Sequence, residues 1–150
     1  MKMIEVKLSQ GAKPSHGGVL PGAKVTKEIA EIRLVDLGKT VFSPPTHPEF
    51  DSPMGLLQFV KRLRELSGGK PVGFKLCIGR KSEFMAIVKA MLESKILPDF
   101  ITIDGAEGGT GAAPVEFSNR LGTPCLEATY FVNQVLKGAG IRQHIRLISS

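Results

Sequence analysis

The chain has 150 residues, of which 42% are hydrophobic and 23% charged, a balance typical of a folded globular protein. That length suffices for a domain with its own core, and we expect residues 1–150 to form a single domain. No apolar run approaches the roughly 20 residues that cross a bilayer, and the first residues do not form a signal peptide. We therefore expect a cytoplasmic protein that does not bind membranes.

The net charge of +6 arises from 20 basic and 14 acidic residues. This excess suits anionic ligands, but there is no long basic run with interleaved aromatic residues, so the sequence does not support nucleic-acid binding. Cys77 and Cys125 stand alone, without a CxxC pair or a His–Cys cluster. They indicate neither a metal site nor a disulfide framework, and core thiols are the favoured interpretation.

The first third of the chain predicts a strand, a loop and a short helix. Apolar and polar residues alternate over residues 4–8, which is typical of a strand, and a loop rich in glycine and proline follows. Thr26 is a candidate N-cap for a helix that carries Ile29 and Ile32 on one side. The prolines within residues 43–48 exclude a regular helix, and we expect an irregular segment there.

The middle of the chain predicts two helices on either side of a strand. Ser52 and Pro53 are the N-cap and first-turn proline of the first helix, which ends near Gly68 and Gly69. Residues 71–77 have strand character. The second helix has apolar residues on one predicted face, namely Phe84, Ile87, Val88, Met91 and Leu92.

The last third predicts two more strands and one more helix. The strands are residues 99–104 and 145–148, and residues 116–137 are expected to form one helix interrupted near residues 122–124. Strands that alternate with helices favour an α/β fold of parallel βα units with right-handed connections.

Four strands are half of what a (β/α)₈ barrel requires, since that fold has eight strands and takes about 250 residues. The sequence also stops directly after its last predicted strand. We therefore expect about half of a TIM barrel, as part of a larger protein. A self-contained α/β sheet is the alternative.

A glycine-rich turn follows the strand in residues 101–114, which read ITIDGAEGGTGAAP. Glycine has no Cβ and reaches positive φ, so such a turn lets backbone N–H groups approach a flat or anionic ligand. The turn lacks the Lys-Ser/Thr ending of a P-loop and fits the dinucleotide fingerprint only in part. Taken alone, it favours an ordinary strand-to-helix connection, and a ligand-binding surface is the alternative.

Several motifs in the same order resemble the FMN-binding domain of glutamate synthases. They are KLSQGAKPSHGGVLPGAKV at residues 7–25, Ser-Pro-Pro at 43–45, Lys75-Leu76 and the loop 104–114. The likeness extends to short glutamate-synthase-like flavoproteins without the amidotransferase part. It implies a (β/α)₈ barrel with FMN across the carboxyl ends of the strands, where an imine made from 2-oxoglutarate and ammonia is reduced to glutamate.

Under this resemblance, Lys75 is the first candidate for both catalysis and cofactor binding. A lysine at the carboxyl end of a strand places positive charge near the N1/O2 edge of a reduced flavin, or near a keto acid. Without the resemblance, a surface lysine with a buried stem is the favoured interpretation. The other residues expected at the cofactor are Gln10, Asp104, Gly108, Gly109 and Gly111. For Asp104, a hydrogen bond to the turn that follows its strand is an equal alternative.

The resemblance also implies a substrate-binding group, which consists of Lys13, Gly17, Gly18 and Glu107. A solvated loop, with Glu107 facing water, is the alternative. Glutamate synthases commonly have Gly-Glu where this chain has Ser15-His16, at a position where the resemblance implies a substrate contact. His16 is a second catalytic candidate, because an imidazole exchanges protons near neutral pH. An exposed loop histidine is the alternative.

In the family, the FMN phosphate is held by loops after the last strands, and a cysteine cluster beyond them holds an iron–sulfur centre. This sequence encodes neither, so we expect low activity from the isolated chain. The favoured function is a glutamate-synthase-like FMN oxidoreductase acting on a 2-oxoglutarate-like anion. The alternative is a non-catalytic half-barrel that binds an anionic metabolite or self-associates. Unpaired strand edges favour a homo-oligomer, or pairing with the rest of a barrel.

Overall fold

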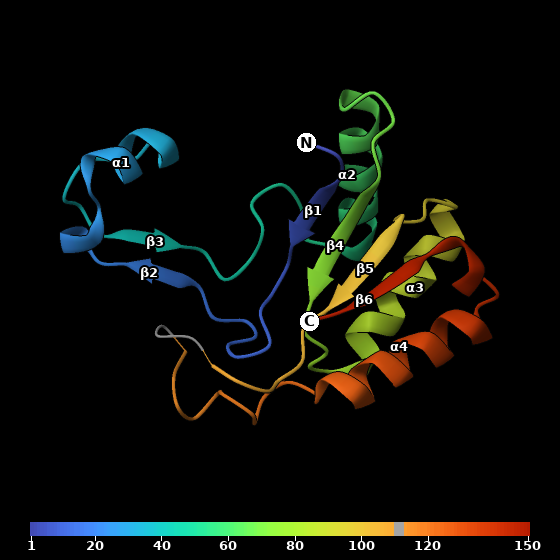
Figure 1. The fold of residues 1–150 in the computed structure, drawn as a ribbon. Coiled ribbons are helices and arrows are strands. Elements are labelled where there is room, and N and C mark those ends of the chain that lie inside the picture. Colours follow the sequence, from blue (N-terminus) through green and yellow to red (C-terminus); the bar gives the residue numbers. More distant parts are fainter. Residues whose placement is uncertain (110–112) are drawn as a thin grey trace.

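The computed structural model describes residues 1–109 and 113–150, and its main feature is a sheet of four parallel strands (Figure 1). In spatial order, the strands are β1 (Ile4–Lys7), β4 (Val72–Leu76), β5 (Phe100–Ile103) and β6 (Arg146–Ser149). Every neighbouring pair in this sheet is parallel. The strand order follows the order along the chain, and the predicted α/β class with parallel strands is confirmed.

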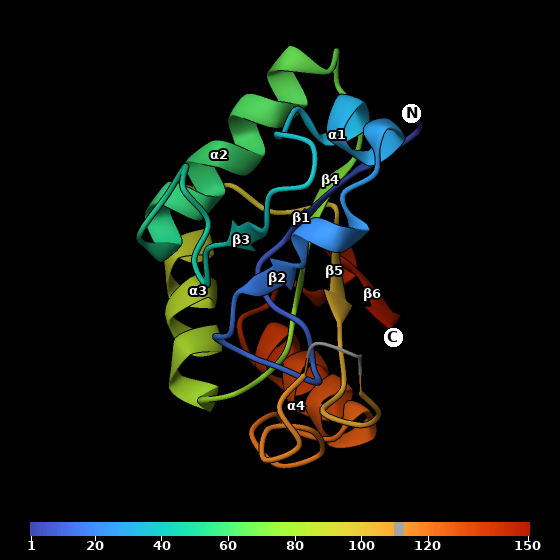
Figure 2. The same ribbon diagram turned by 90° about the vertical axis from the view of Figure 1, so that its left-hand side faces the viewer.

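Three helices cover one face of this sheet, and the other face is turned toward β2 and β3 (Figures 1 and 2). The helices are α2 (Pro53–Leu66), α3 (Lys81–Ser94) and α4 (Cys125–Gly138). Their buried side chains pack on the alternate strand residues that point toward them, and this core includes Leu57, Val60, Phe84, Met91, Val132, Leu136, Val72, Phe74, Ile101 and Ile103. Parallel βα units bury apolar faces in this way.

The local signals that delimit α2 act as predicted. Ser52 Oγ accepts a hydrogen bond from Gly55 N–H at 3.2 Å, and Pro53 is the first helical residue. Gly68 and Gly69 have φ of 72° and 85° and follow the end of the helix. In α3, Leu92 was expected on the buried face but is 49% exposed. Leu92 directly follows buried Met91, and successive residues of an α-helix are rotated by about 100° around its axis. This rotation places Leu92 at the edge of the apolar stripe.

On the open face of the sheet, two contacts join strands through side chains. The Thr102 hydroxyl donates a hydrogen bond to the Glu5 carboxylate, which links β5 to β1 across β4. A Cβ on Gly73 would lie 2.6 Å from the ring of Phe100, so this glycine gives the ring its space. Phe100 is correspondingly buried.

A small projecting unit separates β1 from α2 along the chain (Figure 1). Its strands β2 (Gly18–Leu20) and β3 (Val41–Ser43) pair antiparallel, and between them lie a 3₁₀ turn η1 (Gly22–Lys24) and the helix α1 (Lys27–Arg33). The irregular segment predicted within residues 43–48 is confirmed for residues 44–48. The sequence predicted neither β2, which lies in the expected glycine- and proline-rich loop, nor β3, because three residues are too few to show alternation. The α1 cap was predicted correctly, but Ile32 is 74% exposed.

The predicted helix 116–137 is confirmed only beyond its expected interruption near residues 122–124. Residues 115–120 form turns, and α4 begins only at Cys125. Asn119 has a φ of 64°, in the left-handed region, which ends the helical turn that Pro114 starts. A 3₁₀ turn η2 (Arg142–His144) then leads into β6, whose prediction is confirmed. No helix in the described part of the chain has the length and apolar character needed to cross a membrane.

Candidate functional site

Two loops meet at the carboxyl edge of the sheet, one after β1 and one after β5. Gly11 N–H donates a hydrogen bond to Asp104 Oδ2 at 2.8 Å. A Cβ on Gly11 would lie 1.5 Å from the carbonyl oxygen of Gly105, so no larger residue fits without moving a loop. Ser9 Oγ accepts a hydrogen bond from Cys77 N–H at 2.8 Å, which fastens the first loop to the end of β4. The loops therefore form one packed surface.

Lys75 points into this surface from β4 and forms an ion pair with Asp104. Its Nζ lies 2.9 Å from Asp104 Oδ1 and donates to Ser150 Oγ at 3.2 Å. The two side chains are only 20% and 17% exposed. Burial raises the pKa of Asp104, but the Gly11 N–H and the Lys75 ammonium together outweigh burial and hold this pKa below its usual value. Asp104 is therefore an anion at neutral pH.

Next to this pair lies a pocket of about 270 Å³, on which the loop after β1 and residues 43–45 converge. Three of its lining residues are basic, namely Lys7, Lys13 and His16, and none of its lining residues within the described ranges is acidic. The Lys13 residue is only 7% exposed, and its Nζ donates to Gly17 O at 3.3 Å. Among the ion pairs of the described residues, none involves Lys13.

Among the described residues, the one hydrogen bond of the Lys13 ammonium goes to a carbonyl oxygen, and a buried lysine in such a place is unfavourable unless an anion neutralises it. The pocket thus has the charge and the donors to bind a carboxylate. Gln10 and the backbone of Gly17 and Gly18 contribute to the same lining. Gly17 is required here, because a Cβ would lie 2.1 Å from the carbonyl oxygen of Ser43.

His16 lies at the rim of the pocket. Its Nδ1 is 2.7 Å from Gly17 O, and because a carbonyl oxygen only accepts, the proton of the ring lies on Nδ1. The other ring nitrogen, Nε2, is then a proton acceptor in the neutral imidazole. The ring packs edge-on against Phe117, with centroids 5.8 Å apart.

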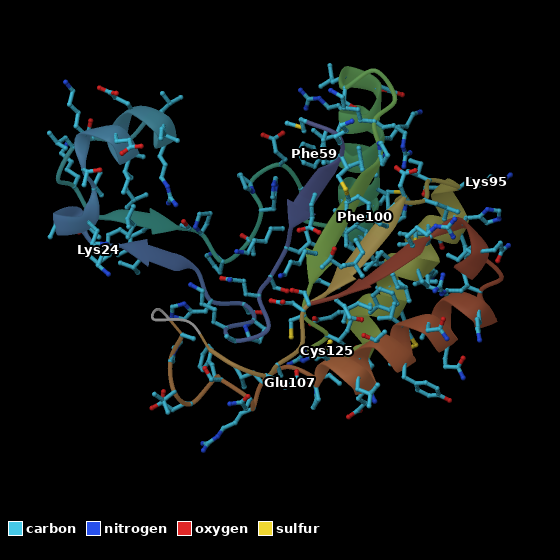
Figure 3. All side chains as sticks on the ribbon, in the orientation of Figure 1. Lys24, Phe59, Lys95, Phe100, Glu107 and Cys125 are labelled. Carbon is cyan, nitrogen blue, oxygen red and sulfur yellow. The ribbon has the colours of Figure 1, made fainter. Side chains whose placement is uncertain are left out.

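Glu107 does not line this pocket. Both of its carboxylate oxygens lie 2.8 Å from Cys125 N, and the two residues are adjacent at the start of α4 (Figure 3). Pro124 provides no side-chain cap, so Glu107 caps this helix from the glycine-rich loop. Gly108 N–H donates to Asn119 Oδ1 at 3.0 Å. Gly111 lies outside the described residues.

The structure thus gathers Gln10, Lys13, His16, Gly17 and Gly18 around one pocket and pairs Lys75 with Asp104. It places Glu107 and Gly108 in contacts with the segment that leads into α4. The sequence analysis missed the roles of Ser9 and Asn119. Ser9 lies within the quoted motif, but its partner is 68 residues away, so no local pattern reveals the contact.

A second cavity of about 530 Å³ lies between the N-terminal ends of α2 and α3. Leu8, Phe50, Leu56 and Ile87 contribute to its lining, and His47 stacks on Phe50 with ring centroids 4.6 Å apart. Within the described ranges, no group of three or more His, Cys, Asp and Glu residues is arranged to hold a metal ion.

Comparison with known proteins gives the family. The family described as the conserved region in glutamate synthase matches residues 1–150. The glutamate synthase large subunit-like protein YerD of Bacillus subtilis is 43% identical over 150 residues, which are 100% of this chain and 28% of that protein. An archaeal glutamate synthase [NADPH] of Methanocaldococcus jannaschii is 39% identical over 148 residues, 98% of this chain and 28% of that protein.

A ferredoxin-dependent glutamate synthase 2 of Synechocystis is 35% identical over 148 residues, which are 97% of this chain and 9% of that protein. The chain therefore spans less than a third of the length of these relatives. Because the family match runs from the first residue to the last, the chain belongs to the glutamate synthase family, whose conserved region it carries.

Proposed function

We propose that residues 1–150 form one domain, built as three consecutive βα units and a fourth strand of a (β/α)₈ barrel. The strand order β1-β4-β5-β6 follows the chain, and all three covering helices lie on one face, as in such a barrel. A doubly wound sheet has helices on both faces and a reversal of strand order. In the proposed barrel, the open face is the interior, and the edges of β1 and β6 meet further strands or a second copy.

The activity we propose is that of a glutamate-synthase-like oxidoreductase that uses FMN. FMN supplies hydride transfer, and the substrate is a 2-oxoglutarate-like anion whose imine is reduced to an amino acid. The observation that carries this proposal is buried Lys13, which lines a pocket beside the Lys75–Asp104 pair; none of the described residues that line this pocket is acidic. Active sites of (β/α)₈ barrels lie at this carboxyl edge.

The residues fit a flavin and a dicarboxylate in chemically different ways. Lys75 provides a fixed positive charge for the electron-rich pyrimidine edge of a reduced flavin, and Gln10 an amide. Lys13 provides the charge that binds a substrate carboxylate, with the backbone of Gly17 and Gly18 beside it. His16 holds its proton on Nδ1, which leaves Nε2 to take up or return a proton at the pocket.

The glycine-rich loop contributes differently from these side chains. Asp104 supports the flavin side of the site by holding Lys75, since both of its oxygens already have partners. Gly108 and Gly109 offer a surface without side chains for a flat ring. Glu107 reaches a substrate only by leaving Cys125 N.

The test is a titration of the purified chain with FMN, followed by flavin fluorescence, and a separate NMR titration with 2-oxoglutarate. We expect saturable binding of both, and weaker binding of FMN or 2-oxoglutarate by Lys75→Ala, with the fold unchanged. Lys24→Ala is the matched control, because Lys24 is exposed on the projecting unit (Figure 3). Absence of FMN binding by the wild-type chain would mean that these residues alone do not form a flavin site, and would favour an incomplete barrel or a non-catalytic module.

A non-catalytic anion-binding module is the second candidate. The pocket around Lys13 is formed within this chain alone, which favours this function if the chain works without flavin. Binding of 2-oxoglutarate without binding of FMN would support it. Sedimentation would then establish whether the chain self-associates through its open strand edges.

A further inference from the structure

The short segment between the glycine-rich loop and α4 contains a residue that bonds the loop twice. Asn119 N–H donates to Ala106 O at 3.0 Å, and Asn119 Oδ1 accepts from Gly108 N–H at 3.0 Å. The two bonds lie on either side of Glu107. A single residue thus fixes the backbone of Ala106 and Gly108 from 11 or more positions away.

The backbone conformation of Asn119 explains why this residue type suits the position. Its φ of 64° lies in the left-handed region, which asparagine enters more readily than most residues other than glycine. Glycine reaches the same φ but has no acceptor. Asn119 is exposed, so packing in the core does not account for it.

Two further contacts hold the same stretch of the loop. Ala106 N–H donates to Thr123 O at 3.1 Å, and the Glu107 carboxylate accepts from Cys125 N–H. Residues 119–125 therefore form a frame for residues 106–108. Of these contacts, only the one from Asn119 Oδ1 reaches a glycine of the loop.

We infer that Asn119 is a positioning residue for the glycine-rich loop, which sets the backbone of Gly108 and Gly109 for a ligand at the carboxyl edge. This inference rests on the proposed flavin site. It also restricts that site, because the Gly108 N–H is occupied by Asn119 Oδ1 and is not a donor to the ligand. Gly108, at a φ of 84°, then contributes its carbonyl and its bare Cα.

Three substitutions separate the backbone conformation from the side-chain acceptor. Asn119→Gly keeps the positive φ and removes the acceptor, Asn119→Asp keeps an acceptor, and Asn119→Ala disfavours the φ and removes the acceptor. Arg120→Gly is the matched control, because it adds a glycine to the same exposed turn. Each variant is examined by amide hydrogen exchange at Gly108, by FMN titration and by thermal unfolding.

Loss of one hydrogen bond predicts faster exchange at Gly108 and weaker FMN binding in Asn119→Gly, each by about 2- to 10-fold. Asn119→Asp is expected to restore both to near the wild-type values, and Arg120→Gly to leave both unchanged. Wild-type exchange at Gly108 in Asn119→Gly would overturn the inference. Faster exchange with unchanged FMN affinity would also overturn it, by leaving Asn119 a purely structural role.

Failure of the proposed function has a different signature. In that case the wild-type chain and every variant fail to bind FMN, and the part of the inference that concerns ligand binding is wrong. The exchange rates still decide whether Asn119 orders the loop.

Discussion

Asp104 contacts two partners with different oxygens, and its Oδ1 lies 2.9 Å from Lys75 Nζ while its Oδ2 accepts from Gly11 N–H. This one carboxylate fixes both the lysine at the end of β4 and the loop after β1. The ion pair also means that the Lys75 charge is already balanced in the free protein. An additional anion at Lys75 competes with Asp104 for the ammonium.

Removing the Asp104 carboxylate should destabilise the fold. Asp104→Ala leaves the Lys75 ammonium and the Gly11 N–H without this partner, and we expect a loss of about 1–3 kcal/mol in the free energy of unfolding. Asp104→Asn keeps an acceptor for Gly11 and should lose less. Urea denaturation measures both losses. Equal midpoints for Asp104→Ala and wild type would show that the pair contributes nothing to stability.

The same pair predicts how stability depends on pH. The folded pKa of Asp104 is lowered, so between the folded and unfolded pKa values the unfolded chain binds more protons. The stabilisation is complete above the unfolded pKa of about 3.9 and is lost as pH falls through the lower folded pKa. Asp104→Asn should therefore differ most from wild type near neutral pH and converge with it in acid.

The measurement for this pH dependence is the free energy of unfolding at a series of pH values, with the Gly11 amide chemical shift as a local reporter. The amide shift should titrate with Asp104 in the wild-type chain and stay flat in Asp104→Asn. If the difference in the free energy of unfolding between wild type and Asp104→Asn is undiminished at the lowest pH, the pH dependence does not come from Asp104.

Lys13 is expected to serve ligand binding at some cost to stability. Lys13→Met keeps an unbranched side chain and removes a buried charge, so we expect unchanged or slightly higher stability. Binding of 2-oxoglutarate should weaken by about 10- to 100-fold, the range for losing a hydrogen bond to a charged group. Calorimetry and thermal unfolding test the two parts. The exposed Lys24→Met is the control, and equal affinities in both variants would remove Lys13 from the site.

Gly11 provides a steric test of how the two loops meet. Gly11→Ala places a methyl group 1.5 Å from Gly105 O, so a loop must move, at an expected cost of about 1–3 kcal/mol. Gly79→Ala is the matched control, because a Cβ there meets nothing within 4 Å. Urea denaturation compares the two. A Gly11→Ala variant as stable as Gly79→Ala would mean that the loops separate freely.

The sequence predicted β1 from its alternation of apolar and polar residues, and the other three strands of the sheet from short apolar segments next to predicted helices. It could not predict β2 and β3, which have three residues each, or the turns of residues 115–120, where a helix was expected. The expected interruption near residues 122–124 coincides with the start of α4 at Cys125. The apolar spacing identified the buried face of α3 but not its edge at Leu92. Short elements and single backbone conformations carry little periodic signal.

For the candidate site, residue type and family resemblance pointed to Lys13 and Lys75, and the structure puts both at the carboxyl edge. Neither the capping of α4 by Glu107 nor the bond from Ser9 to Cys77 N–H was predicted. Such contacts join residues far apart in sequence. They depend on how the loops pack once the sheet has formed, so local patterns do not encode them.

The close approach of Gly11 to Gly105 also bears on how a ligand reaches the pocket. Separating the two loops would break the hydrogen bond from Gly11 N–H to Asp104. It would also disturb the ion pair between Asp104 and Lys75. The loops are therefore joined into one surface. At the proposed site, we expect a ligand to reach the pocket without opening the contact between Gly11 and Gly105.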